Sequence, residues 1–565
     1  MSAHDPQRAA ADPSHSAWVS ANAGAGKTHT LANRVTRLLL AGAKPERILC
    51  LTYTKAAAAE MAGRLFDQLG KWAMAPDETL ASYIEEIGAD GRTPDELRKA
   101  RRLFALALET PGGLKIQTIH SFCQQLLARF PLEAGVPPSF DVLDEQTARE
   151  LIGRARAQML ERAGTGDATL ASAVSYLVTQ TNETRLQQIL DAALVGDRRK
   201  LERVLTTLTD DRTKALRRGH GLDEDRSETE IISEFCEEVK AEIGQLEATI
   251  EWLESGKAAD QKHADALRRA LTLDLTFESF DAFKEAFLTG KGEPYASLAT
   301  KGLAAKHPDL LEYLESLSRR FCAAEEQRRG AHAAALCDAA VTLAQAIRER
   351  YTAEKRLRGA LDYDDLINET RRLLERGDAA AWVLYKLDGG LDHILVDEAQ
   401  DTSPEQWAIL RKLTEEFFAG AGSLGERALE RTIFAVGDEK QSIFSFQGAD
   451  PVQFDINRQH FEERVKTSSH AFAYERLTTS RRSAPQILSF VDEVFRDPDA
   501  RAGLTSTGAE ITHTPLRETA KGRVEFWPSL KPPTEDDTDP WTRPVDTVSE
   551  ASSVSRLAKQ LAEKI

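Results

Sequence analysis

The sequence predicts an α/β protein that contains a doubly wound parallel sheet. Short apolar runs of strand length recur at residues 18–21, 48–52, 115–119, 393–396 and 432–436. From about residue 145 to 358 such runs stop, and charged sequence with apolar residues at helical spacing follows, for example Leu311, Leu314 and Leu317. The chain has 565 residues, 41% of them hydrophobic, which is enough for three or more domains. We therefore expect a sheet domain that a large α-helical insertion interrupts.

The first apolar run breaks into a glycine-rich loop where a helix is expected to begin. The loop reads Ala21, Asn22, Ala23, Gly24, Ala25, Gly26, Lys27 and Thr28. In this arrangement the glycines turn backbone N–H groups towards a triphosphate, Lys27 supplies charge to its β- and γ-phosphates, and Thr28 offers a hydroxyl to Mg²⁺. Ala21 stands where the usual pattern has glycine, and an ordinary turn into a helix is the alternative interpretation. Because strand, loop and helix fall where the motif needs them, the sequence favours a P-loop NTPase with a RecA-like sheet.

Two further apolar runs end in residues suited to phosphate and metal chemistry. Residues 393–396 are followed by Asp397 and Glu398. Asp397 is a candidate Mg²⁺ ligand, and Glu398 is a candidate base that polarises the water attacking the γ-phosphate. Residues 432–436 lead to Gln441, where an amide that senses the ligand is expected. Either acidic loop alone would more often be a solvated turn, but three such strand ends together predict a site for a triphosphate and a metal ion.

In the order of these motifs the chain resembles the UvrD-like superfamily 1 DNA helicases, and among them the AddA subunits of bacterial helicase–nucleases that repair double-strand breaks. The resemblance rests on Gln7 and on residues 21–28, 51–61, 118–122, 361–366, 396–401, 436–449 and 480–483. The likeness to AddA also uses the linking segment 109–117, and it covers about the first 490 residues. It implies an ATP- and Mg²⁺-dependent helicase that acts in DNA repair and recombination and travels 3′→5′ along single-stranded DNA.

The resemblance assigns nucleotide contacts to three more residues. Gln7 is expected to read N6 and N7 of adenine, and Arg481 to stack on the base in place of the family's usual tyrosine. Arg482 is expected to reach the γ-phosphate from the second motor domain as an arginine finger. A solvated side chain for Gln7 and a surface salt bridge for either arginine are the alternatives. The candidate catalytic set is therefore Lys27, Glu398, Gln441 and Arg482.

Candidate DNA contacts follow from the same resemblance. Tyr53 and Phe446 lie where related helicases stack an aromatic ring on a base, and core packing is the alternative for each ring. Thr118 and His120 are expected on a loop after a strand, where they could bind a backbone phosphate. A helix N-cap at Ser121 is the alternative there. Gln447 replaces an arginine that many relatives carry.

The resemblance also implies partners, which are single-stranded and double-stranded DNA and an AddB-type subunit in a heterodimer. Two motifs of the second motor domain and the nuclease domain of AddA are not found, so the chain is expected to be a fragment or a truncated gene product. Two alternatives stay open. One is a fragment that binds ATP and DNA without unwinding, and the other is a UvrD-like repair helicase that works without a nuclease partner.

Changes of pattern suggest four segments. Residues 1–144 are expected to form the first part of the first motor domain, 145–358 a helical insertion, 359–468 the second part, and 469–565 the start of a second motor domain. Strands are expected at 473–477 and 522–527 in that last segment, followed by a Pro- and Asp-rich surface loop at 528–552.

Composition agrees with a cytoplasmic enzyme. The formal net charge of −17 predicts weak non-specific affinity for DNA. The five cysteines never fall in a Cys-x-x-Cys spacing, so free thiols are expected. No apolar run is expected to approach the ~18 residues of a membrane span, and the N-terminus does not resemble a signal peptide. The sequence therefore predicts no association with a membrane.

Overall fold

The computed structural model describes residues 5–91, 93–195, 212–222, 226–273, 275–388, 390–418, 431–443, 448–468, 470–505, 508, 510–531 and 552–564. The chain forms two compact units. Unit 1 comprises residues 1–119, 384–442 and 450–565, and unit 2 comprises residues 120–383 and 443–449. The expected insertion of residues 145–358 falls inside unit 2, which begins earlier and ends later. The finer division of the chain into motor domains stays a prediction.

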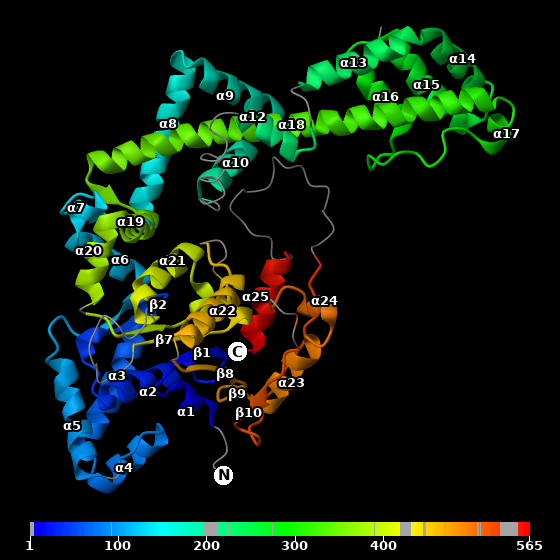
Figure 1. Cartoon of the computed structure of the whole chain (residues 1–565). Helices are drawn as coiled ribbons and strands as arrows, with labels where there is room; N and C mark the ends of the chain where they lie inside the picture. Colours follow the sequence, from blue (N-terminus) through cyan, green and yellow to red (C-terminus); the bar gives the residue numbers. More distant parts are fainter. Residues whose placement is uncertain are drawn as a thin grey trace. The chain divides into compact units, whose positions relative to one another are not determined.

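Unit 1 is built on a six-stranded sheet in which every pair of neighbours is parallel, in the order β3-β2-β6-β7-β1-β8 (Figure 1). Its strands are β1 (Ser16–Ala21), β2 (Ile48–Thr52), β3 (Lys115–Thr118), β6 (His393–Val396), β7 (Thr432–Gly437) and β8 (Phe472–Leu477). The predicted α/β class with a parallel central sheet is thus confirmed. Because the strands are parallel, their carboxyl ends meet at one edge of the sheet, where ligands bind in such folds.

Helices, short 3₁₀ turns and a small second sheet complete unit 1. These elements are α1 (Pro6–Ala10), α2 (Lys27–Ala41), η1 (Pro45–Arg47), α3 (Lys55–Met74), α4 (Asp77–Glu86), α5 (Pro94–Leu108), η2 (Ala399–Asp401), α21 (Pro404–Leu413), η3 (Glu415–Phe418), η4 (Glu439–Gln441), α22 (Val452–Thr467), β9 (Thr479–Ser480), α23 (Pro485–Val494), α24 (Pro498–Arg501), β10 (Thr514–Pro515) and α25 (Ser553–Lys564).

The strand at 472–477 corrects the sequence analysis, which expected residues 473–477 to open a second motor domain. β8 instead pairs with β1 at the edge of the first sheet, with Ala17 opposite Ala473 and Ala21 opposite Leu477. Its mixed polar and apolar residues suit a partly covered edge strand, and the sequence of the strand does not reveal which neighbour it joins. The expected strand at 522–527 is also wrong: those residues have no strand partner, and Phe526 is 87% exposed.

Helices cover both faces of the sheet. Side chains alternate along each strand, so both faces carry apolar side chains that these helices bury. Ala17 and Val19 of β1 lie in one core with residues of α2, α3 and α5. Trp18 points to the opposite face, where its ring centroid lies 5.5 Å from that of Trp407 on α21 and 5.1 Å from that of Phe454 on α22. Burying one such side chain stabilises the fold by about 1.5–3 kcal/mol. This two-sided coverage is the doubly wound arrangement that the sequence predicts.

Unit 2 is almost entirely helical in the residues that the structure describes. Its elements are α6 (Ile119–Arg129), α7 (Pro131–Ala134), β4 (Asp141–Val142), α8 (Glu145–Thr165), α9 (Ala168–Gln180), α10 (Glu183–Val195), α12 (Arg212–Gly219), α13 (Glu228–Ala241), α14 (Ile243–Glu254), α15 (Ala258–Thr272), α16 (Ser279–Phe287), α17 (Lys301–Ala304), α18 (Pro308–Leu357), β5 (Ala360–Leu361), α19 (Tyr363–Glu375) and α20 (Gly377–Asp388), the last of which ends beyond the unit boundary.

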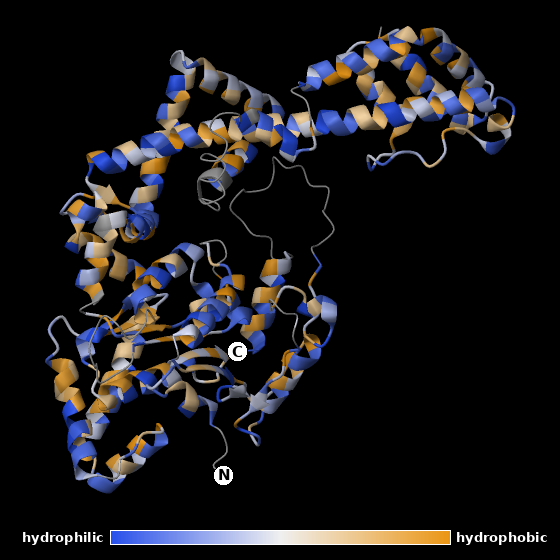
Figure 2. Cartoon of the chain, viewed as in Figure 1, coloured by the Kyte–Doolittle hydropathy of each residue, from blue (hydrophilic) through white to orange (hydrophobic). Residues whose placement is uncertain are grey.

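Helix α18 organises unit 2, since two separate cores form along its 50 residues (Figures 1 and 2). The first half of α18 packs with α13 to α16 around an aromatic cluster that includes Phe235, Phe283 and Phe321. The second half packs with α8, α9 and α10 through aliphatic residues such as Leu343 and Ile347. The helix is therefore the shared wall of two hydrophobic cores.

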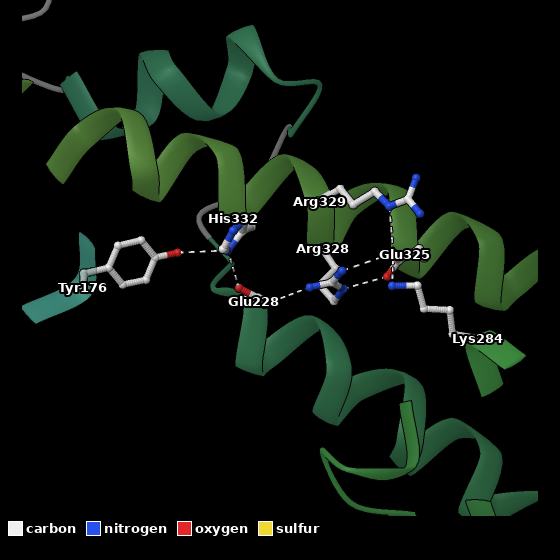
Figure 3. Close-up of polar contacts among 7 residues, drawn as sticks. All are labelled: Tyr176, Glu228, Lys284, Glu325, Arg328, Arg329 and His332. Carbon is white, nitrogen blue, oxygen red and sulfur yellow. Dashed lines mark hydrogen bonds and ion pairs between the residues drawn. The ribbon is translucent and has the colours of Figure 1, made fainter. Parts of the chain in front are cut away.

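Between these cores α18 carries a set of polar and charged side chains around the buried Glu325, which we call the α18 ion network (Figure 3). Glu325 is 3% exposed, and its carboxylate lies 2.6 Å from Arg328 Nε, 2.7 Å from Arg329 Nε and 3.9 Å from Lys284 Nζ. Burial alone would raise the pKa of Glu325, but the hydrogen bonds from Arg328 and Arg329 outweigh it and lower that pKa. The network consists of Tyr176, Glu228, Lys284, Glu325, Arg328, Arg329 and His332.

Helix α18 also bears on membrane association. Among the described residues, α18 alone is long and apolar enough to cross a membrane by length and composition, with a best window of mean hydropathy 1.2. This corrects the expectation that no apolar run approaches that length. However, 44% of that window is buried inside the protein, and the core helix of a globular unit passes the same test.

Candidate active site

The glycine-rich loop connects the end of β1 to the start of α2, as the sequence predicts. Gly24 and Gly26 have φ values of +75° and +88°, which side-chain-bearing residues rarely adopt. A Cβ atom at Gly24 would also lie 2.7 Å from Arg482 Cβ, so the backbone has no room for a side chain there. Gly26 caps α2 without a side-chain hydrogen bond, which leaves the first N–H groups of the helix to an anion. The loop therefore fits a phosphate group.

Lys27 and Glu398, two of the predicted catalytic residues, are in direct contact. Lys27 Nζ lies 2.5 Å from Glu398 Oε2, and their side chains are 10% and 34% exposed. Glu398 follows β6 and has a left-handed backbone with φ of +47°, one of two non-glycine residues with positive φ in the described part of the chain. Such strain persists where the surroundings impose it, often at functional sites. The structure thus brings the predicted phosphate-binding lysine and the candidate base together.

Asp397, the predicted metal ligand, is buried beside this pair. Burial, together with the negative charge of Glu398, raises the pKa of Asp397 to about 6. Its Oδ1 accepts a hydrogen bond of 3.0 Å from the backbone N–H of Glu398. A buried carboxylate with a raised pKa gains from a cation, and Thr28, in the first turn of α2, is the expected second ligand. Asp397 therefore suits the Mg²⁺ ion that the sequence predicts, and Thr28 stays a predicted ligand.

Gln441 lies on the turn that follows β7. Its Nε2 donates to Asp438 Oδ2 at 2.6 Å, and Lys440 Nζ lies 2.6 Å from Asp438 Oδ1. The backbone N–H of Asp438 in turn donates to Gln400 Oε1 at 2.8 Å. The loop after β7, which carries Gln441, is therefore hydrogen-bonded to the acidic loop after β6.

Gln7, which precedes β1, and Arg481, which follows β9, both adjoin the glycine-rich loop. Gln7 Nε2 donates to the carbonyl of Ala25 at 2.8 Å, and Arg481 Nη2 donates to Gln7 Oε1 at 2.6 Å. The backbone N–H of Arg481 donates to the carbonyl of Gly24 at 2.9 Å, and Arg482 follows directly. This corrects one expectation: Arg482 was expected to come from a second motor domain, but Arg481 and Arg482 follow β8 and β9 of unit 1, and the backbone of Arg481 contacts the loop.

One residue that holds this arrangement was not found by sequence reasoning. Arg34 of α2 is fully buried, and its guanidinium donates to the carbonyls of Ala10, Asp12 and His15. Burial lowers the pKa of Arg34 to about 9. These contacts hold the segment that carries Gln7 against α2. In the sequence Arg34 looks like any helical cation, and only its place among apolar neighbours could have signalled burial.

The residues predicted to contact DNA lie in different surroundings in the structure. Tyr53 follows β2 and is half-buried, and burial with the charge of Asp401 raises the pKa of Tyr53 to about 12.

Thr118 is the buried last residue of β3. His120 lies in α6 rather than on a loop, with its ring 5.4 Å from that of Tyr363, and burial lowers its pKa. Ser121 is the third residue of α6, so it is not the N-cap. Phe446 and Gln447 lie outside the described residues.

Comparison with known proteins agrees with this geometry. Residues 3–462 match the family described as the UvrD/REP helicase N-terminal domain. RecBCD enzyme subunit RecB of Escherichia coli (strain K12) is 25% identical over 512 residues, which are 85% of this chain and 38% of that protein. An ATP-dependent helicase/nuclease subunit of Latilactobacillus sakei is 26% identical, over 79% of this chain and 50% of that protein. The corresponding helicase/nuclease subunit of Desulforamulus reducens is 25% identical, over 88% of this chain and 39% of that protein.

The chain spans between 38% and 50% of the length of these curated relatives. The family match, by contrast, extends over most of the chain and includes the strands β1, β2, β3, β6 and β7, the phosphate loop and the helical unit. The chain therefore belongs to the UvrD/REP helicase family.

Proposed function

We propose that the chain is the motor portion of an AddA-type DNA helicase, which hydrolyses ATP with Mg²⁺ and moves 3′→5′ along single-stranded DNA during double-strand-break repair. The contact between Lys27 and Glu398 at the glycine-rich loop carries this proposal. Asp397 beside that contact and the Gln441 loop bonded to it support the same chemistry. The names of the relatives, which describe helicase/nuclease subunits, support the repair role.

Each residue has a defined part in the proposed hydrolysis. Lys27 leaves Glu398 for the β- and γ-phosphates when ATP enters, which frees the carboxylate. Glu398 accepts a proton from water as the water oxygen bonds to the γ-phosphorus, and the bond from that phosphorus to the bridging oxygen breaks to release ADP. Bound Mg²⁺ supplies charge that neutralises the phosphate oxygens. Arg482 would supply a further positive charge to the γ-phosphate, and Gln441 would report its presence.

Contacts with the adenine of ATP and with the DNA strand are assigned to other residues. We infer that Gln7 and Arg481 contact the adenine, since the hydrogen bonds of Gln7 hold both at the phosphate loop. Tyr53, half-buried at the end of β2, is proposed to stack on a base of the strand. Thr118, His120 and Phe446 stay weaker candidates for DNA contact. An AddB-type subunit is the proposed partner, and a location in the cytoplasm follows from the DNA substrate.

Single-turnover ATP hydrolysis, measured with and without single-stranded DNA, tests this function. We expect Mg²⁺-dependent hydrolysis that the DNA accelerates. Movement is then followed on strands with a fluorophore at the 3′ or the 5′ end, and signal from the 5′ end supports 3′→5′ travel. Failure to bind Mg²⁺-ATP would contradict the site, and arrival at the 3′ end would contradict the direction alone.

A further inference from the structure

The side-chain amide of Gln400 lies at the meeting point of the loops that carry the proposed chemistry. Gln400 is 1% exposed. Its Nε2 donates to Glu398 Oε2 at 2.9 Å and to Asp401 Oδ2 at 3.1 Å. Its Oε1 accepts from the backbone N–H of Asp438 at 2.8 Å. Both N–H bonds of the amide are therefore used on carboxylates, and its orientation is fixed because only the oxygen can face an N–H donor.

The end of β7 is shaped to admit this amide. A Cβ atom on Gly437 would lie 2.6 Å from Gln400 Oε1 and 2.9 Å from Phe454, so a side chain at this position would displace Gln400. The next residue, Asp438, binds Gln400 through its backbone and Gln441 through its carboxylate. A continuous set of hydrogen bonds thus runs from Glu398 through Gln400 and Asp438 to Gln441.

Lys27 and Gln400 bind the same oxygen of Glu398, Oε2. The two contacts differ in charge, since Lys27 neutralises the carboxylate and Gln400 only orients it. A carboxylate paired with an ammonium group is a weaker base than one held by a neutral amide. When phosphate attracts Lys27, the amide of Gln400 is the contact that stays with Glu398.

We propose that Gln400 is a positioning residue for ATP hydrolysis, which holds the Glu398 carboxylate towards the attacking water while Lys27 is engaged on phosphate. This inference rests on the function proposed above. Gln400 acts through Glu398 and does not itself touch the nucleotide. Asp401 and the backbone of Asp438 keep the amide in place, so that the base retains one orientation.

The first test compares two buried glutamines. Gln400→Met keeps the length of the side chain and removes its hydrogen bonds. We expect single-turnover hydrolysis to slow by roughly 10- to 100-fold, part of the contribution of a general base, with the Kd for ATP changed less than about threefold. The matched control is Gln406→Met, because Gln406 is also buried and caps α21 through a 3.0 Å bond from Ser403 N–H to its Oε1, away from Glu398. That control should keep its hydrolysis rate even where its Tm falls.

A double-mutant cycle separates positioning from any independent effect. If Gln400 acts through Glu398, then Glu398→Gln combined with Gln400→Met hydrolyses ATP no more slowly than Glu398→Gln alone. If the two substitutions reduce the hydrolysis rate independently, so that their effects multiply in the double variant, the proposal is overturned. Normal hydrolysis by Glu398→Gln itself would instead contradict the site assignment of the proposed function. A slow Glu398→Gln with a normal Gln400→Met would contradict only the role of Gln400.

Binding of phosphate analogues gives a readout that needs no turnover. ADP with aluminium fluoride mimics the phosphoryl group in transfer with its attacking water, whereas ADP with beryllium fluoride mimics bound ATP. Gln400→Met should weaken the aluminium fluoride complex about tenfold and leave the beryllium fluoride complex within about twofold. Equal weakening of both complexes, or of neither, would show that Gln400 does not position Glu398.

Discussion

Lys27 Nζ and Glu398 Oε2 lie 2.5 Å apart although 371 positions of sequence separate the two residues. The contact neutralises the candidate base. In the proposed mechanism, ATP displaces Glu398 from Lys27 before Glu398 accepts a proton, which links the arrival of phosphate to the activation of water. Until then Lys27 pairs the carboxylate of Glu398, whose side chain is 34% exposed.

Lys27→Ala should slow ATP hydrolysis by at least about 100-fold, because it removes the charge that meets the developing negative charge on phosphate. The fold should persist, since Glu398 is 34% exposed and water can replace the lost partner. Single-turnover hydrolysis and the far-UV circular dichroism melt measure the two effects. Lys55→Ala, at the exposed first position of α3, is the matched control and should change neither. Hydrolysis by Lys27→Ala near the unsubstituted rate would refute the site.

Tyr53→Ala should weaken binding of single-stranded DNA by about 1–3 kcal/mol with an unchanged dependence on salt, since stacking releases no counterions. Tyr53→Phe keeps the ring and should bind DNA normally. Fluorescence anisotropy with a labelled oligonucleotide at several salt concentrations measures both quantities. Unchanged binding by Tyr53→Ala together with a lower Tm would mean that this half-buried ring is only a packing residue.

His393 should make unit 1 sensitive to acid. Burial, with the nearby charge of Arg34, lowers the pKa of His393 to about 4, whereas the unfolded chain has the ordinary value of about 6.5. Between these two values the unfolded state binds a proton that the folded state does not. The free energy of unfolding therefore falls as the pH decreases from about 6.5 to about 4, by up to about 3 kcal/mol for this residue.

The His393→Asn variant provides the comparison, because asparagine does not titrate and retains a polar group near Thr432 Oγ1, which lies 2.9 Å from His393 Nδ1. Urea denaturation at pH 7, 6 and 5 should show a shallower loss of stability in the variant than in the unsubstituted protein. Parallel loss in both proteins would assign the acid sensitivity to other groups.

Glu325→Leu should destabilise unit 2 by about 1.5–3 kcal/mol, because it removes the buried carboxylate that Arg328 and Arg329 share and leaves Arg328 only its contact with Glu228. Thermal melting followed by helix circular dichroism measures the change. Glu326→Gln, at an exposed neighbouring position of α18, should change the Tm little. A Glu325→Leu variant as stable as the unsubstituted protein would show that the favourable interactions of the α18 ion network only offset the free-energy cost of burying its charges.

Sequence reasoning succeeded where the signal was local. The apolar runs predict β1, β2, β3, β6 and β7, and the residues just after them lie where the motifs place them, because chain continuity fixes a loop to its strand. It failed where a residue depends on a distant partner. β8 joins β1 rather than a new sheet, and Arg34 is buried by the segment before β1. Gln400 stood in a recognised motif, but its link to Asp438 exists only once β6 and β7 are adjacent.

The insertion of unit 2 between β3 and β6 also governs how the sheet is made on the ribosome. β2 is bonded to β3 on one side and to β6 on the other, and roughly 340 residues separate β2 from β6. At a synthesis rate of about 5–20 residues per second, one edge of β2 stays unpaired for about 17 to 70 seconds. An apolar strand edge left open for that long invites pairing with other nascent chains. We therefore expect the yield of folded protein to fall when translation is slowed and to rise with chaperones that shield β2 until β6 emerges.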